Sequence, residues 1–302
     1  MVRKEGVEIS YFRPVLAFAV LALFFWALNR VVPAIKTQRF VRSGFWTDCC
    51  YWLWAATFNR AQGPLAVGLL SALGAWIAGV EFAEIRDGRG PLAAQPIALQ
   101  IIEVFLIGDF LAYWEHRIRH SRLAWRFHAV HHSPNELDWL SAKRVHPIDN
   151  LVPLFMRTAP ILVSGFAAFP IALYMAASAY WPIVCHANLN WKLGPFSHVI
   201  VSPVFHRWHH TKTVEGTDKN FGGLLAIWDL LFGTFYLPAG RTPQVFGLDD
   251  PMTDDFVGQM LAPFRPKIRA MPAAAFALQT SPQHPHQAKA HAEEVRAISR
   301  RS

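Results

Sequence analysis

The sequence predicts an all-α protein, a polytopic bundle of membrane helices with a cap of shorter, histidine-bearing helices on the cytoplasmic side. Three observations support this fold class. Of the 302 residues, 53% are hydrophobic, and the mean hydropathy is +0.20, which is typical of a membrane protein. The apolar residues gather in long runs separated by basic and polar stretches. Histidines cluster at the ends of these runs at spacings of three and four, which place side chains on one helix face.

The first apolar run, residues 11–32, is long enough to cross a bilayer. Arg13 and Arg30 lie near its ends, where long basic side chains reach the lipid headgroups. The run has no small-residue cleavage site and is followed by more basic residues, so we expect an uncleaved anchor rather than a signal peptide. Residues 1–44 are therefore expected to form an anchor helix and a basic linker.

Residues 45–240 are expected to form a catalytic membrane domain. Its first stretch, residues 45–58, is short and aromatic, as in an interfacial helix or part of a span. Residues 65–80 are continuously apolar and predict a short span. Residues 97–114 predict a helix that leads into the first histidines and carries Asp109.

Eight histidines fall into three clusters, or boxes: His116 and His120; His128, His131 and His132; His206, His209 and His210. A straight helix from His116 to His132 would be about 24 Å long, whereas two metals in one site lie only about 4 Å apart. We therefore predict a break between the first two boxes, with Ser121 as the N-cap of the second helix. Ser202 and Pro203 predict the start of the third box's helix.

The apolar region between the second and third boxes, residues 151–184, must return to the side from which it starts if the boxes share one site. We predict a hairpin of two short helices, or a re-entrant segment. Phe169–Pro170 is the expected turn, because proline interrupts a helix.

Clustered imidazoles suit zinc, copper or iron. A mononuclear catalytic zinc takes three protein ligands and a water, so eight or more histidines favour a dinuclear centre. The alternative interpretation, surface or core histidines, fits a lone histidine better than three spaced boxes.

The order of the boxes resembles that of the fatty acid hydroxylase / sterol desaturase superfamily of membrane di-iron enzymes. Three further stretches resemble it: Arg144-Val-His-Pro147, His186-Ala-Asn188, and the segment from Asn220-Phe-Gly-Gly through Trp228-Asp229 to Phe232-Gly-Thr-Phe235. The resemblance spans about residues 45–237. It implies that the eight box histidines and His186 bind metal.

Four other residues are candidates for the site. On the resemblance, His146 is expected to bind metal, to hydrogen-bond a ligand or merely to cap a helix. Asn190 stands where relatives carry a second histidine, so a ligand is missing there. Asp109 is expected to orient a ligand imidazole. Asp229 is expected to do the same or to be a plain surface acid.

The resemblance implies two non-haem iron ions, O2 as co-substrate and a membrane lipid as substrate. Because the sequence has no embedded haem or flavin signature, electrons must come from an external ferredoxin, cytochrome or reductase. We favour hydroxylation of a fatty-acyl, alkyl or headgroup C–H bond, and sterol or fatty-acyl desaturation is the alternative. A haem- or metal-binding membrane protein without oxygenase activity is the alternative of another class. Ligand spacing names neither the substrate nor the oligomeric state.

The net charge of +8 gives no case for a nucleic-acid partner, because the basic residues flank apolar runs. Such flanks fit lipid headgroups and place the box-bearing side in the cytoplasm. The three cysteines form no Cys-x-x-Cys pair, which indicates a reducing or membrane setting. Residues 241–302 are expected to be a tail. From about residue 265 it is basic and expected to be disordered, and its His284, His286 and His291 are left out of the site.

Overall fold

The computed structural model describes residues 5–59 and 87–265, with scattered residues between 65 and 84. The chain divides into two compact units, Met1–Met271 and Pro272–Ser302. The second unit, and with it the expected basic tail, lies outside the described residues. Half of the span expected over residues 65–80 lies outside them too.

The described residues form helices and contain no named strand, so the all-α prediction is confirmed for them. The α-helices are α1 (Glu5–Val31), α2 (Phe45–Trp54), α5 (Gly90–Ala93), α6 (Ile97–Arg119), α7 (Trp125–His132), α8 (Leu151–Pro153), α9 (Ala159–Val163), α10 (Ala168–His186), α11 (Pro203–His209), α12 (Ile227–Leu231) and α13 (Phe256–Leu261). Two π-helical turns, η1 (Ala55–Asn59) and η3 (Leu154–Thr158), continue α2 and α8. The 3₁₀ turns are η2 (Trp139–Lys143), η4 (Gly194–His198), η5 (Val214–Gly216) and η6 (Ala262–Phe264).

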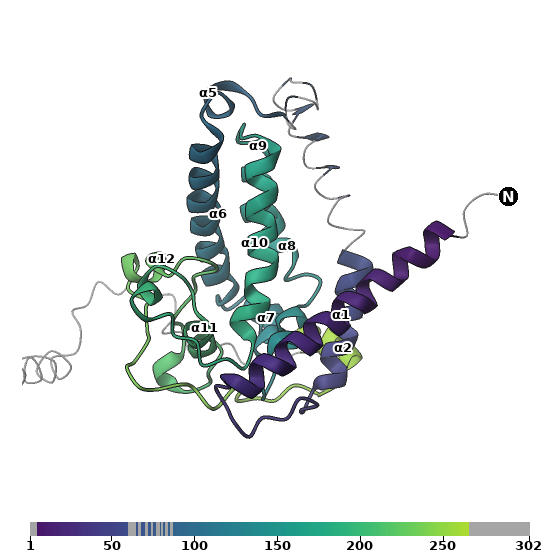
Figure 1. Cartoon of the computed structure of the whole chain (residues 1–302), viewed down its shortest axis with the longest axis vertical. Helices are drawn as coiled ribbons and strands as arrows, with labels where there is room; N and C mark the ends of the chain where they lie inside the picture. The colour runs from purple at the N-terminus through teal and green to yellow at the C-terminus, as the bar shows by residue number, and fades with distance from the viewer. Residues whose placement is uncertain are drawn as a thin grey trace, which may run out of the picture. The chain divides into compact units, whose positions relative to one another are not determined.

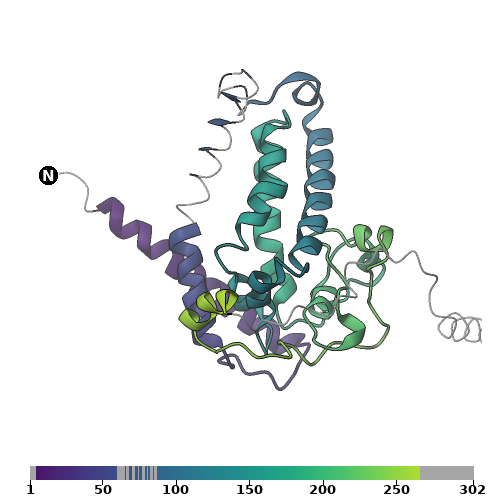
Figure 2. The same ribbon diagram turned by 180° about the vertical axis from the view of Figure 1, so that it is seen from behind.

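Helices α6 and α10 stand side by side in Figure 1 and in the reverse view of Figure 2. They are the two described helices that are long and apolar enough to cross a membrane. Gly108 permits their close contact, because a Cβ atom there would lie 2.5 Å from the Tyr174 ring. Val104, Ile161 and Phe166 pack in the same apolar cluster as Tyr174.

The region 151–184 is a hairpin, but its turn lies at residues 164–167 and the turn predicted at Phe169–Pro170 is wrong. Gly165, with φ +106°, makes the bend, and its carbonyl accepts a hydrogen bond from the Arg89 amide at 2.8 Å. Pro170 lies in the first turn of α10, where the missing N–H costs no helical hydrogen bond. The first arm, α8–η3–α9, is shorter than the second arm, α10.

The N-terminal helices and the segment after residue 240 both pack beside the box-bearing helices. The Phe25 ring of α1 stacks on Trp139 of η2 at 5.5 Å. Helix α1 contains a shorter apolar stretch, Val15–Val31, and its role as an anchor stays a prediction. Tyr51 of α2 contacts Phe256 of α13 at 4.9 Å, so the chain stays folded past residue 240.

Candidate metal centre

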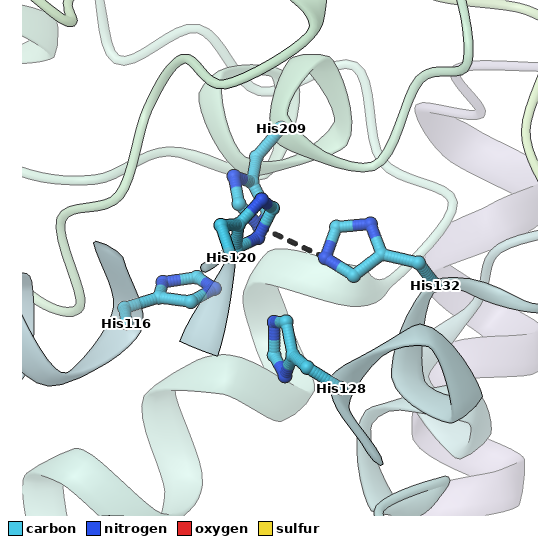
Figure 3. A group of neighbouring side chains, drawn as sticks. All are labelled: His116, His120, His128, His132 and His209. Atoms are coloured by element: carbon cyan, nitrogen blue, oxygen red, sulfur yellow. Dashed lines mark hydrogen bonds between the residues drawn. The ribbon is translucent and has the colours of Figure 1, made fainter. Parts of the chain in front are cut away.

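Nine buried histidines converge in two adjacent groups. The five-histidine group consists of His116, His120, His128, His132 and His209, and the four-histidine group of His131, His186, His206 and His210. Within each group, one ring nitrogen from every histidine lies within 4.8 Å of the others. Figure 3 shows the five rings turned toward one another, with a dashed line joining His132 and His209. The two groups are neighbours, because the His132 and His210 rings stack at 4.3 Å.

The two His-x-x-His-His boxes are shared between the groups in opposite ways. In the second box, His128 and His132 join the five-histidine group, while His131 joins the other. The third box reverses this division, since His209 joins the five-histidine group and the other two of its histidines join the four-histidine group. Residues four apart lie on one helix face, so each box gives a pair to one group and a single histidine to its neighbour.

Local chain geometry places the boxes as the spacing predicts. Helix α6 ends at Arg119 and α7 begins at Trp125, so the predicted break between the boxes is present. Ser121 is not the N-cap, however: Ala124 holds that position, and Ser121 accepts the Trp125 amide through its backbone carbonyl at 2.8 Å. The predicted start of α11 is confirmed, because the Ser202 side chain accepts the Phe205 amide.

Oxygen atoms accept hydrogen bonds from the Nδ1 atoms of six histidines, which leaves Nε2 to point into the groups. Four acceptors are backbone carbonyls: Phe221 for His116, Arg144 for His131, Pro182 for His186 and Lys219 for His209, at 2.7–3.1 Å. Two are carboxylates: Asp218 for His120 at 3.2 Å and Asp149 for His128 at 3.0 Å. An oxygen acceptor on the outer nitrogen is the usual way to orient a metal-binding imidazole.

Asp149 and Asp218 were missed in the sequence. Asp149 follows the second box by seventeen residues and also accepts a hydrogen bond from Arg119 at 3.2 Å. Asp218 lies in the polar loop after the third box. The available signal was the chemistry of imidazole itself: each ligand needs an acceptor for its second nitrogen, and acids near the boxes are natural candidates.

The pair His131–His186 provides the test of whether these groups fit a metal. Their Nε2 atoms lie 3.2 Å apart. A carbonyl can only accept, so the Nδ1 atoms facing Arg144 and Pro182 carry the protons. The Nε2 atoms of the neutral rings then hold lone pairs, which repel each other unless a cation lies between them. Nitrogens bound at about 2.1 Å to one metal stand about 3.0–3.4 Å apart, so the spacing fits a metal ion.

Burial keeps the box histidines neutral, the form in which imidazole binds metal. Desolvation lowers the pKa of His128, His132 and His209 well below the ordinary value. The pKa of His120 is also lowered by burial, although the hydrogen bond to Asp218 opposes that shift. The three rings with unpartnered, buried Nε2 atoms, those of His116, His120 and His128, all belong to the five-histidine group.

Comparison with known proteins agrees with this geometry. Residues 101–234 match the family described as fatty acid hydroxylase, and this match includes all nine histidines. This part of the chain is therefore similar to fatty acid hydroxylases.

Proteins similar to this chain include ornithine lipid hydroxylase OlsE of Rhizobium tropici, 34% identical over 58% of this chain and 53% of that protein. Alkylglycerol monooxygenase of Homo sapiens is 31% identical over 49% of this chain and 33% of its own length. Methylsterol monooxygenase 2-2 of Arabidopsis thaliana is 27% identical over 46% of this chain and 53% of its own length. The chain thus spans about half or less of the relatives it matches. No solved structure matches it significantly.

Among the residues that match this family, His186 joins the four-histidine group, as the resemblance implied, whereas His146 joins neither. The His146 Nε2 donates to the Met260 carbonyl at 3.2 Å, and Nδ1 accepts the Ile148 amide at 3.1 Å. Both ring nitrogens are therefore engaged in holding the loop to the α13 segment, and the possibility that His146 binds metal is wrong.

Among the described residues, no hydrogen bond joins Asp109 or Asp229 to a histidine, so the prediction that they orient an imidazole directly is wrong. Asp229 is buried, so it is not a surface acid either. Asp109 accepts the Leu224 and Leu225 amides, both at 2.8 Å. Asp229 accepts the Phe221 amide at 2.8 Å. Because the Phe221 carbonyl in turn accepts from His116, Asp229 supports that ligand through the backbone.

Asn190 lies outside both groups. It is exposed, and its Oδ1 accepts a hydrogen bond from the Thr242 hydroxyl at 3.2 Å. Asn190 therefore contributes no ligand atom to either group.

Proposed function

We propose that the protein is a membrane-bound di-iron oxygenase that hydroxylates a C–H bond of a lipid. The observation that supports this most directly is the convergence of neutral, buried imidazoles in two neighbouring groups. The printed names of the relatives join a lipid with the insertion of oxygen: ornithine lipid hydroxylase, alkylglycerol monooxygenase and methylsterol monooxygenase. None of these names is a desaturase, which favours hydroxylation.

The five-histidine group would hold one iron ion and the four-histidine group the other. When bound, two irons supply the redox chemistry that O2 needs, which histidine side chains lack. Hydroxylation consumes one O2, two electrons and two protons, and releases one water for each oxygen atom inserted. The chain's own residues orient the imidazoles through the oxygens of Asp149, Asp218 and the four carbonyls. Burial of the histidines keeps water from the centre.

The proposal places α6 and the 151–184 hairpin in the membrane, with the histidine groups on the cytoplasmic side. Basic residues at and just after the C-terminal end of α6, among them Arg117, Arg119 and Arg122, support this side by the positive-inside rule. Single cysteines at Asn135 and Thr213 in a cysteine-free background should react with an impermeant reagent from the cytoplasmic face alone. Labelling of the two positions from opposite faces would refute a shared centre.

We propose that an acidic electron carrier, of the ferredoxin or cytochrome type, docks at the α6–α7 loop. Arg122 and Arg126 are exposed there and flank Leu123, whose exposure is 84%. Behind the loop, the Trp125 ring lies 5.0 Å from His120 and 5.1 Å from His132. The double change Arg122→Glu, Arg126→Glu should raise KM for an acidic ferredoxin and flatten its salt dependence. An unchanged KM would refute the docking site.

Lipid mass spectrometry tests the function itself. Cells that express the wild-type chain should accumulate a lipid heavier by one oxygen atom than the lipid of cells that express His120→Ala. Loss of two hydrogens instead would establish desaturation and contradict hydroxylation. Identical lipid profiles in both strains, with both proteins present in the membrane, would contradict the proposed activity.

A further inference from the structure

On the side of α6 that faces away from α10, the short helix α12 carries a group of exposed apolar side chains (Figure 1 and Figure 2). Leu230, Leu231 and Phe232 are 45%, 69% and 38% exposed. We name these three residues the apolar shoulder. Adjoining exposed apolar side chains mark a surface that binds a partner or a membrane. Three features of the surroundings indicate what covers the apolar shoulder.

The first feature is the contact between α12 and the apolar helix α6. The Phe232 ring lies 5.0 Å from the Trp114 ring, and the Trp228 ring lies 5.3 Å from the Phe110 ring. Ile107, one turn before Phe110 on the same face of α6, is 45% exposed. The apolar shoulder therefore continues the exposed apolar face of a helix that is apolar enough to cross a membrane.

The second feature is the distribution of charge along the chain. Residues 221–237 contain one charged residue, Asp229, and its side chain is buried. The preceding loop, residues 211–220, contains four charged residues: Lys212, Glu215, Asp218 and Lys219. Charged side chains are mostly exposed where a protein faces water, whereas they are costly in lipid. The change in charge therefore indicates that the loop faces water and that α12 faces lipid.

The third feature is the depth of α12 relative to the basic end of α6. Arg117 donates to the Tyr113 hydroxyl at 3.2 Å, and its guanidinium lies 5.4 Å over the Trp114 ring. Basic and tryptophan side chains together are typical of the headgroup level of a bilayer. Phe110, which contacts Trp228 of α12, precedes Arg117 by seven residues, or about 10 Å along the helix. Helices that lie in a membrane interface are buried by about 5–10 Å, so the depth of α12 fits such a helix.

We propose that the apolar shoulder is inserted into the lipid bilayer from the side of the histidine groups and does not cross it. This proposal rests on the proposed function, because α6 must lie in the membrane. Asp229, just before the apolar shoulder, accepts the Phe221 amide at 2.8 Å and the Gly222 amide at 2.7 Å. The Phe221 carbonyl in turn orients His116. The bilayer therefore supports the loop that orients a proposed metal ligand.

Quenching of a fluorescent label tests the insertion without turnover. A nitrobenzoxadiazole label is attached to a single cysteine, Leu231→Cys, Ile107→Cys or Val214→Cys, in a cysteine-free background. The full-length chain is then placed in nanodiscs of phosphatidylcholine and phosphatidylglycerol. Iodide quenches the label from water, and a lipid with a nitroxide on its acyl chain quenches it from the bilayer. Ile107 is the lipid reference, and Val214, which is 89% exposed in the charged loop, is the water reference.

We expect the label at Leu231 to lose most of its fluorescence to the nitroxide lipid and little to iodide, as at Ile107, whereas Val214 should show the reverse. Leu230→Cys, a second position on the apolar shoulder, should behave like Leu231→Cys.

Two results would overturn the proposal alone. Iodide quenching at both shoulder positions, with Ile107 quenched by the nitroxide lipid, would place the apolar shoulder in water. Protection of both positions from both quenchers would mean that protein covers the apolar shoulder, for example a second copy of this chain. Iodide quenching at Ile107 as well would instead refute the membrane position of α6 that the proposed function requires.

Discussion

The two histidine groups are built from the same residue type but are oriented by different partners. In the five-histidine group, carboxylates orient two rings, through Asp149 and Asp218, and backbone carbonyls orient those of His116 and His209. In the four-histidine group, the oriented rings, those of His131 and His186, face backbone carbonyls. A carboxylate partner makes an imidazole a more basic metal ligand than a carbonyl partner does. We therefore expect the two proposed metal positions to differ, with the tighter one in the five-histidine group.

The groups also differ in how much of the fold they need. Four members of the five-histidine group come from the stretch His116–His132, and α11 adds one. The four-histidine group draws its members from α7, α10 and the α11 segment. It therefore exists only when the hairpin has folded back to the boxes.

Removal of one ligand from either group should have the largest effect. We expect His120→Ala and His210→Ala each to lower turnover by more than about a hundredfold, beyond the range seen for changes around a metal's ligands. His198→Ala is the matched control, because His198 is exposed and stacks on Phe235 away from both groups. Normal turnover in either box variant would remove that histidine from the centre.

The inequality of the groups is tested through the carboxylates. Asp149→Asn and Asp218→Asn should each weaken the tighter metal site about 10–100-fold and leave the other site unchanged. Competition with a chelator measures both affinities, and Asp250→Asn, an exposed acid, is the control. If both sites weaken equally, the carboxylates do not distinguish the groups.

Unfolding at acidic pH tests a property that both groups share, the burial of neutral histidines. Burial lowers the pKa of His131, His132 and His206 well below the ordinary value. At acidic pH the unfolded state therefore binds protons that the folded state does not bind. The free energy of unfolding is therefore unaffected by these histidines above a pH of about 6.5. Below that pH it falls by about 1.4 kcal/mol per pH unit for each such histidine. Thermal unfolding of the metal-free protein should therefore move to lower temperature below that pH. A flat profile would mean that the rings are not buried in this way.

His146, the histidine that belongs to neither group, should show the smallest effect. His146→Ala should keep the full metal content and lower stability by about 1 kcal/mol, the value of a typical hydrogen bond. Metal analysis and thermal unfolding measure the two quantities. Loss of metal from this variant would show that His146 is a metal ligand.

Local spacing explains what could be predicted from the sequence. The break before α7, the N-cap at Ser202 and the face shared by histidines four apart depend on neighbours in the chain. The hairpin followed from the requirement that the boxes meet, although its turn is set by Gly165 and not by a proline.

Long-range partners explain what could not be predicted. The division of each box between two groups depends on which helix faces it. The spacing of Asp109 from His116 suggested an imidazole partner. Its carboxylate instead accepts a hydrogen bond from the Leu224 amide. His146 looked like a ligand by its sequence context, and the chain around Met260 determines its actual partner.

Iron analysis of the purified full-length chain and two variants tests the account most directly. The wild-type chain should bind about two iron ions per chain, as a dinuclear centre does. His128→Ala, from the five-histidine group, and His206→Ala, from the four-histidine group, should each retain about one. A single metal in the wild-type chain that neither substitution removes would contradict the two-group centre.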